Sequence, residues 1–249
     1  MKALVEIVAF WLLPLALLIE YRCWQSIYWA TPGFIYYVIA VPALATYMIV
    51  ATGAGWLKLW GFNLKYTVRK VPVPIGLVYC SVINMLLLIF AKLLAPPSMI
   101  SSTIAIVLLI TISGAILGSL YDVVIVHYRL LNVYIRPFYK RDNAIKIVAA
   151  YGPWFFGLMG LVSGLSVKFG EYLLIETNHA ASLAVVIAAG TLIIYAPFLL
   201  YFLVIIEQKR RKIESKDKVG SAVALFGIVF NINPIAINKV IMGTLVKKQ

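Results

Sequence analysis

Residues 33–57 read GFIYYVIAVPALATYMIVATGAGWL and carry no charged side chain, whereas the next thirteen residues, KLWGFNLKYTVRK at 58–70, carry four Lys and Arg. A helix needs about 20 apolar residues to cross the hydrocarbon core of a bilayer. Basic clusters beside such runs are typical of the cytoplasmic side of membrane proteins. The two stretches together predict a membrane-spanning helix that ends in the cytoplasm.

The rest of the chain repeats this alternation. It is 63% hydrophobic and only 12% charged, with a mean hydropathy of +0.97, whereas about a quarter of the residues of soluble proteins are charged. No polar stretch is long enough for a soluble domain, so residues 1–249 are predicted to form a single transmembrane domain. The predicted spans are 3–19, 33–57, 75–95, 99–122, 146–168, 180–206 and 219–246.

The distribution of basic residues predicts the orientation. Alternate gaps hold four, five and six of them, at 58–70, 129–146 and 209–218, and with Lys2 this makes sixteen on one side. The intervening gaps hold three, at Arg22, Lys92 and Lys168. The positive-inside rule then predicts an all-α, polytopic helical bundle in the cell membrane with its N-terminus in the cytoplasm.

The last apolar segment is open to two interpretations. It is interrupted by Asn231, Asn233 and Pro234, and Lys239 follows. Proline removes a helix hydrogen bond, and asparagine side chains can bond to the freed backbone. We favour a seventh span, while a re-entrant hairpin that returns to the cytoplasm, after six spans, agrees better with the charge rule.

Small residues recur at the spacing by which helices pack closely in membranes. They are Gly114 and Gly118, Gly160 and Gly164, and Ala180, Ala184 and Ala188. Lipid tails are as apolar as the side chains of the helices, so no hydrophobic force drives the helices together in a bilayer. Close backbone approach through such small residues is therefore expected to hold the bundle together.

The acidic residues give little support to ion-coupled transport, which uses carboxyl groups deep in the bilayer. Glu20 and Glu171 are predicted to lie in loops, and no acidic residue is expected near the middle of a span. His127 and His179 are expected on opposite sides of the membrane, so no metal site is predicted. No cofactor motif and no catalytic motif are found, so nothing indicates an enzyme.

One polar cluster stands out, at Asp122, His127 and Arg129. If the helix continues into the cytoplasm, Asp122 and Arg129 are seven residues apart and lie near one helix face. The cluster could bind a polar substrate or gate a cavity. The alternative is an acid and a snorkelling arginine at the level of the lipid headgroups.

The cytoplasmic gaps interleave basic and aromatic residues, a combination that single-stranded nucleic acids bind through phosphate contacts and base stacking. The positive-inside rule, the aromatic belt and attraction to anionic lipid predict the same composition. The candidate contacts to a polyanion or a partner are Lys65, Arg69, Lys70, Arg136, Lys140, Arg141, Lys209, Arg210, Arg211 and Lys212.

Four amides fall within the predicted spans, at Asn84, Asn231, Asn233 and Asn238. They could line an uncharged polar pore, or they could form hydrogen bonds between helices.

Three functions remain open: a non-enzymatic pore or channel subunit of a translocation system, a membrane enzyme that acts on lipid or isoprenoid substrates, and a scaffold subunit of a larger complex. In its number of spans, its scarcity of glutamine and its basic stretches at 65–70, 134–141 and 209–212, the chain resembles the polytopic membrane subunit of the crenarchaeal DNA-import (Ced) apparatus. The resemblance implies a heat-adapted archaeal source and DNA transport by a homo- or hetero-oligomer. Its implied partners are membrane lipids, a cytoplasmic ATPase and small membrane subunits, with no cofactor.

Overall fold

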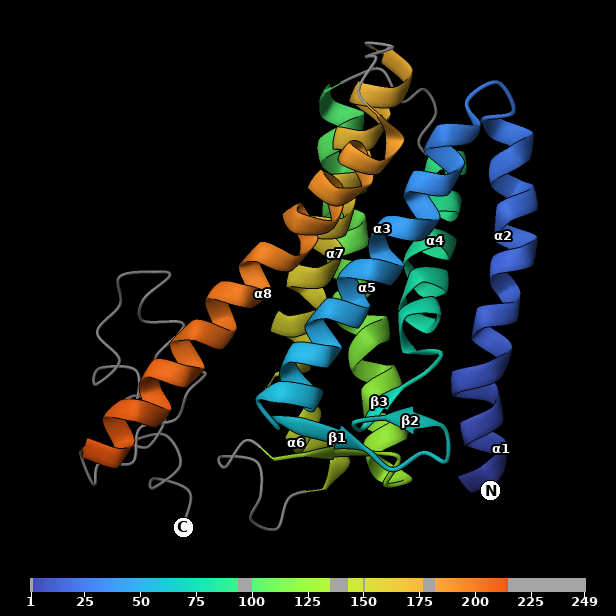
Figure 1. Cartoon of the computed structure of the whole chain (residues 1–249). Coiled ribbons are helices and arrows are strands. Elements are labelled where there is room, and N and C mark those ends of the chain that lie inside the picture. The colour runs from blue at the N-terminus through green and yellow to red at the C-terminus, as the bar shows by residue number, and fades with distance from the viewer. Residues whose placement is uncertain (1, 94–99, 135–142, 150, 177–181, 215–249) are drawn as a thin grey trace, which may run out of the picture.

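The structure is a computed structural model that describes residues 2–93, 100–134, 143–149, 151–176 and 182–214 (Figure 1). It is mostly helical, and five of its helices are long and apolar enough to cross a membrane. They lie within Lys2–Ile27, Pro32–Trp56, Thr103–His127, Gly152–Ile175 and Leu183–Val204. The predicted last span, 219–246, lies outside the described residues, as do Asn231, Asn233 and Asn238.

The first helix is longer than predicted. Helix α1 (Lys2–Ile7), the π-helical turn η1 (Val8–Leu12) and α2 (Leu13–Ile27) follow one another without a break, whereas the sequence predicted an end at residue 19. The π-helical turn precedes Pro14, whose missing N–H removes one regular helix hydrogen bond. The helix continues through Glu20 because this side chain is buried in the bundle, 5% exposed, and is not solvated in a loop.

The other helices also differ from the prediction mainly at their ends. Helix α3 (Pro32–Val50) continues into η2 (Ala51–Trp56), and α4 (Ile75–Leu93) and α5 (Ile100–His127) follow. The predicted span 146–168 is a short α6 (Ala144–Ala149) and a separate α7 (Gly152–Glu171), which continues through η4 (Tyr172–Glu176). Helix α8 (Leu183–Glu214) runs eight residues past the predicted end at 206.

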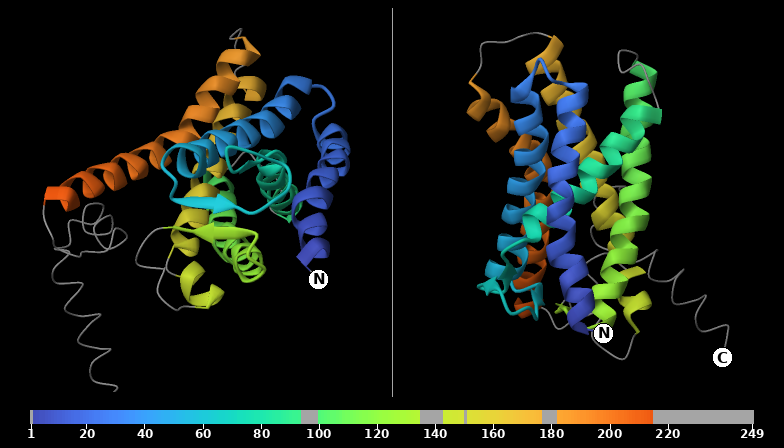
Figure 2. Two further views of the ribbon diagram at one scale, coloured as in Figure 1. Left: turned by 60° about the horizontal axis from the view of Figure 1, so that its bottom comes forward. Right: turned by 90° about the vertical axis from the view of Figure 1, so that its right-hand side faces the viewer.

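The helices pack as a bundle in which α5 and α7 make the most extensive contact, and α3 lies between α4 and α8 (Figures 1 and 2). The main buried cluster surrounds Tyr37, which is fully buried and whose hydroxyl donates to the carbonyl oxygen of Ser166 over 2.7 Å. A second cluster, around Phe10, Phe62 and Ile125, lies at the end of the bundle that holds the strands.

The glycines of α5 and α7 lie in the close contact between these two helices, and the sequence predicted that such residues pack helices. A Cβ atom on Gly160 would lie 2.6 Å from the carbonyl oxygen of Ile110, and one on Gly118 would lie 2.3 Å from the ring of Phe156. The expectation for α8 is not met among the described residues, because Ala184 and Ala188 are exposed there, and Ala180 lies outside the described residues.

The helical class is confirmed, but the sequence did not predict four short strands that form at one end of the bundle (Figure 1). Strand β1 (Trp60–Phe62) pairs antiparallel with β4 (Leu131–Val133), which follows α5. Strands β2 (Thr67–Val68) and β3 (Val71–Pro72) form a hairpin. The basic gap that was predicted as a loop is therefore a folded structure between α3 and α4.

Candidate functional site: a basic cap and buried polar groups

The four strands bring two of the basic gaps together. Gly61 pairs with Asn132 in the β1–β4 ladder, and the backbone N–H of Tyr134 donates to the carbonyl oxygen of Leu59 over 2.7 Å. The ammonium of Lys70 lies over the ring of Tyr134, 5.6 Å from its centroid, and so links the hairpin to the ladder. We name this structure, residues 58–73 and 129–134, the basic cap.

Four residues of the described chain, other than glycine, have a left-handed backbone, and all four are basic residues of the basic cap. The φ angles are 53° at Lys58, 50° at Arg69, 66° at Lys70 and 55° at Arg129. Lys58 follows the end of η2, and Arg129 follows the end of α5. Glycine is the usual residue at such helix ends, since a side chain is strained there, but a cation is favoured by the helix dipole.

A fully buried polar side chain joins three helices. Asn84 of α4 accepts a hydrogen bond from the indole N–H of Trp24 over 2.8 Å and donates to the carbonyl oxygen of Val38 over 2.9 Å. Its amide also donates to the carbonyl oxygen of Cys80 over 3.0 Å. Because Asn84 is fully buried and bonded on both of its polar atoms, it connects α2, α3 and α4.

A buried carboxyl group lies close to this network. The hydroxyl of Ser81 donates to Oε1 of Glu20 over 2.7 Å, and Oε2 of Glu20 has no hydrogen-bond partner among the described residues. The expectation that Glu20 lies in a loop was therefore wrong. Seven residues of helix separate it from Ile27, or about 10 Å at 1.5 Å per residue, so it lies well inside the helix.

The predicted cluster of Asp122, His127 and Arg129 is not assembled. Asp122 is 3% exposed and accepts a hydrogen bond from the hydroxyl of Tyr151 over 2.6 Å, while its Oδ1 has no partner among the described residues. His127 and Arg129 are exposed. Helix α5 does continue to His127, but its left-handed end at Arg129 breaks the helical spacing that would have placed Arg129 above Asp122.

An apolar crevice of about 210 Å³ lies between α4, α5 and α7. Tyr79, Met85, Leu117, Tyr121 and Phe156 contribute to its walls. Tyr121 precedes the buried Asp122 in α5, so the crevice and the carboxyl group lie close together, although the side chain of Asp122 does not line it.

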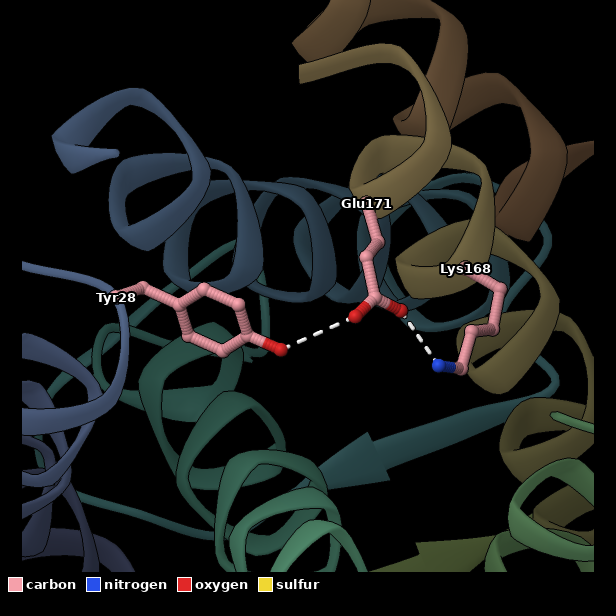
Figure 3. A network of polar contacts seen from close by, with 3 residues as sticks. All are labelled: Tyr28, Lys168 and Glu171. Carbon is pink, nitrogen blue, oxygen red and sulfur yellow. Dashed lines mark hydrogen bonds and ion pairs between the residues drawn. The ribbon is translucent and has the colours of Figure 1, made fainter. Parts of the chain in front are cut away.

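Another group of polar contacts lies at the end of the bundle away from the basic cap, and it consists of Tyr28, Lys168 and Glu171 (Figure 3). The hydroxyl of Tyr28, between α2 and α3, donates to Oε1 of Glu171 over 3.1 Å, and the ammonium of Lys168 contacts Oε2 at 2.5 Å. Burial raises the pKa of the Tyr28 phenol above its ordinary value, and the Glu171 carboxylate raises it further, so the phenol remains a donor at neutral pH. Glu171 is 8% exposed at the end of α7, where the sequence predicted a loop.

The structure describes the side chains of only some of the basic residues that were predicted to contact a polyanion or a partner. Lys65, Arg69 and Lys70 are exposed on the hairpin of the basic cap. The backbone of residues 209–212 continues α8, and the structure does not describe the side chains there. Arg136, Lys140 and Arg141 lie outside the described residues.

Sequence reasoning missed Ser81, Trp24 and Tyr151, which are the partners of Glu20, Asn84 and Asp122. No local pattern pointed to them, because each bond joins residues far apart in the chain, 61 residues apart for Ser81 and Glu20. One signal was available: a lone carboxyl or amide group within an apolar run needs a hydrogen-bond partner, which a neighbouring helix can supply. No group of three or more His, Cys, Asp and Glu that could hold a metal is found among the residues described.

The fold defines a helical bundle with helices of membrane-spanning length and a basic, strand-containing cap. No family model, no curated protein and no solved structure matches the chain.

Proposed function

We propose that the chain is a non-enzymatic, polytopic membrane subunit of a translocation system, with its N-terminus and basic cap in the cytoplasm and with seven spans. The observation that carries the proposal is the separation of charge along the bundle. The basic cap, Lys2 and the basic end of α8 lie at one end, while Arg22 and Lys168 lie toward the other (Figure 1). Positive charge at one end of spanning helices is typical of the cytoplasmic side.

A second feature supports a role beyond orientation. The basic residues of the cap belong to a folded structure in which two distant gaps pair as strands. A fixed arrangement of cations suits an extended anionic partner, because the side chains lose less conformational freedom when they bind. The resemblance to the Ced membrane subunit suggests that this partner is DNA, moved by a separate ATPase in a complex with small membrane subunits.

The proposal is tested by reversing the charge of Arg136, Lys140 and Arg141 to glutamate in the full chain. If an anionic polymer passes this face, the variant should insert at the normal level but lose DNA uptake by cells, since each contact to phosphate would become repulsive. Arg22→Glu, at the opposite end, is the matched control and should keep uptake. Normal uptake by the triple variant would contradict the proposal.

One observation favours a second function, that of a membrane enzyme acting on a lipid or isoprenoid substrate. Oδ1 of Asp122, which has no hydrogen-bond partner within the part of the chain that the structure describes, is a candidate acid or base, and the neighbouring apolar crevice is a candidate site for the substrate chain. Asp122→Asn retains an oxygen that can accept the Tyr151 hydrogen bond but removes the acid. If the chain is such an enzyme, cells that carry this variant should lack a lipid product, as detected by mass spectrometry of cell lipids, while the amount of folded protein stays the same. An unchanged lipid profile would exclude a role for Asp122 in such an enzyme.

A further inference from the structure

The hairpin of the basic cap has a turn that its sequence does not favour. Val68 pairs with Val71, so Arg69 and Lys70 are the two residues of the turn, and both have positive φ. This geometry is a type I′ turn, which is usually formed by Asn-Gly or Asp-Gly because a side chain is strained in it. Strain of this kind persists where surrounding structure imposes it, and it is found preferentially at functional positions.

The hairpin lies beside the first helix, which has an exposed apolar face. The ring of Tyr66 packs edge-on against Trp11, with the ring centroids 5.7 Å apart. Trp11 belongs to a stripe of exposed apolar side chains that runs along the first helix and includes Leu4, Ile7, Leu15 and Leu18.

The length of this helix indicates the depth of the hairpin. The 26 residues of Lys2–Ile27 span about 39 Å at 1.5 Å per residue. This is close to the 40–45 Å of a bilayer with its headgroups, so Lys2 is expected near the outer limit of the headgroup layer. Each headgroup layer takes up about 5–8 Å of this thickness, so Trp11, about 14 Å along the helix from Lys2, lies several ångströms inside the boundary between headgroups and acyl chains. The ring of Tyr66, which contacts Trp11, therefore reaches just below that boundary.

The exposed side chains of the hairpin suit this boundary. Val68 is 67% exposed and Tyr66 is 54% exposed, next to the exposed cations Arg69 and Lys65. The ammonium of Lys65 lies over the ring of Tyr66, 5.4 Å from its centroid. None of the cations of the hairpin pairs with a carboxylate among the residues that the structure describes. Apolar side chains interleaved with unpaired cations match a surface of acyl chains and phosphates.

We propose that the β2–β3 hairpin binds the phosphate groups of anionic lipids in the leaflet at the basic end of the bundle. Lys65, Arg69 and Lys70 contact the phosphates, and Tyr66 and Val68 enter the boundary below them. The left-handed turn directs two consecutive cations from one tip, and the contact of Lys70 with Tyr134 holds the tip against the β1–β4 ladder. This site does not depend on the translocation function, because it anchors the cap whatever the protein transports.

The test replaces Arg69 by Asn and Lys70 by Gly in the full chain. Asn-Gly is the preferred sequence of a type I′ turn, and this gain should offset the loss of the contact between Lys70 and Tyr134, so the double variant should fold with a melting temperature close to that of the wild type. Each cation near an anionic surface contributes an interaction equivalent to about a fivefold change in affinity. Native mass spectrometry of the protein in detergent, titrated with phosphatidylglycerol, should therefore show about twentyfold to thirtyfold weaker lipid retention.

Phosphatidylcholine is the matched lipid control, and its weak retention should be the same in both proteins. Arg22→Gln, an exposed cation at the opposite end, should retain phosphatidylglycerol like the wild type. Unchanged retention by the hairpin variant would overturn the proposal. So would loss of binding to a 20-nucleotide single-stranded DNA with phosphatidylglycerol retention intact, since the hairpin would then be a nucleic-acid contact.

Discussion

Asn84 shows what a single polar residue does in this bundle. Its amide bonds to α2 through Trp24, to α3 through Val38 and to its own helix through Cys80. In an apolar environment the alternative to these bonds is a set of unpaired polar groups, so the asparagine and its partners constrain one another. Of the two interpretations of Asn84, hydrogen bonding between helices agrees with its position, since the side chain has no exposed surface.

Replacing Asn84 by leucine should therefore lower the free energy of unfolding by about 1–3 kcal/mol, because the indole N–H of Trp24 and the carbonyl of Val38 lose their partner. Thermal unfolding in detergent measures this change. Asn63→Ala is the control, because Asn63 is exposed and its amide donates only to the carbonyl oxygen of Arg129, so its effect should stay near 0.5 kcal/mol. Equal melting temperatures for both variants would show that the network does not stabilise the bundle.

At the scale of the elements, α5 and α7 approach each other through glycines. Gly160 faces the backbone of Ile110 directly, whereas a Cβ atom on Gly157 would lie 3.5 Å from the Cβ of Ala115, which is an ordinary contact. The two glycines lie three residues apart on one helix, but only Gly160 lies too close to the facing helix to carry a side chain.

Alanine at the two positions should thus have opposite effects. Gly160→Ala forces a methyl group against a rigid carbonyl and should destabilise the protein by about 1–3 kcal/mol. Gly157→Ala should be neutral or stabilising by up to about 1 kcal/mol, because alanine favours a helix more than glycine does. Thermal unfolding of both variants in the same detergent gives the comparison, and a stable Gly160→Ala protein would mean that α5 and α7 can separate.

On the scale of the whole molecule, the two ends of the bundle differ in charge and in structure. The basic cap closes one end, and the contacts of Tyr28, Glu171 and Lys168 close the other (Figures 1 and 3). This asymmetry predicts which end faces the cytoplasm.

Single cysteines at the two ends report the orientation. In a Cys23→Ser background, which keeps the buried Cys80, a cysteine at exposed Ser26 should react with a membrane-impermeant maleimide on intact cells. A cysteine at exposed Asn63, in the basic cap, should react only after permeabilisation. The reverse pattern would show that the N-terminus and the cap lie outside the cytoplasm.

Several features followed from local patterns alone. Runs of apolar residues located most of the helices, since only apolar side chains are favourable over that length in lipid. The spacing of Gly114, Gly118 and Gly160 indicated residues of close helix packing, but not that α5 packs against α7. Helix ends were less predictable. Glu20 and Glu171 looked like loop residues, because burial by distant segments, here Ser81 and Tyr28, is invisible in the local sequence.

The sequence by itself determined the helical class, the approximate segments and the concentration of positive charge in alternate gaps, because these depend on composition and period along the chain. Only the tertiary structure decided that two basic gaps pair as strands, that Lys58, Arg69, Lys70 and Arg129 adopt left-handed backbones, and that Glu20 and Asp122 are buried. The strand pairing and the burial of the two carboxyl groups rest on contacts between residues tens of positions apart, and these contacts form only once the helices have packed.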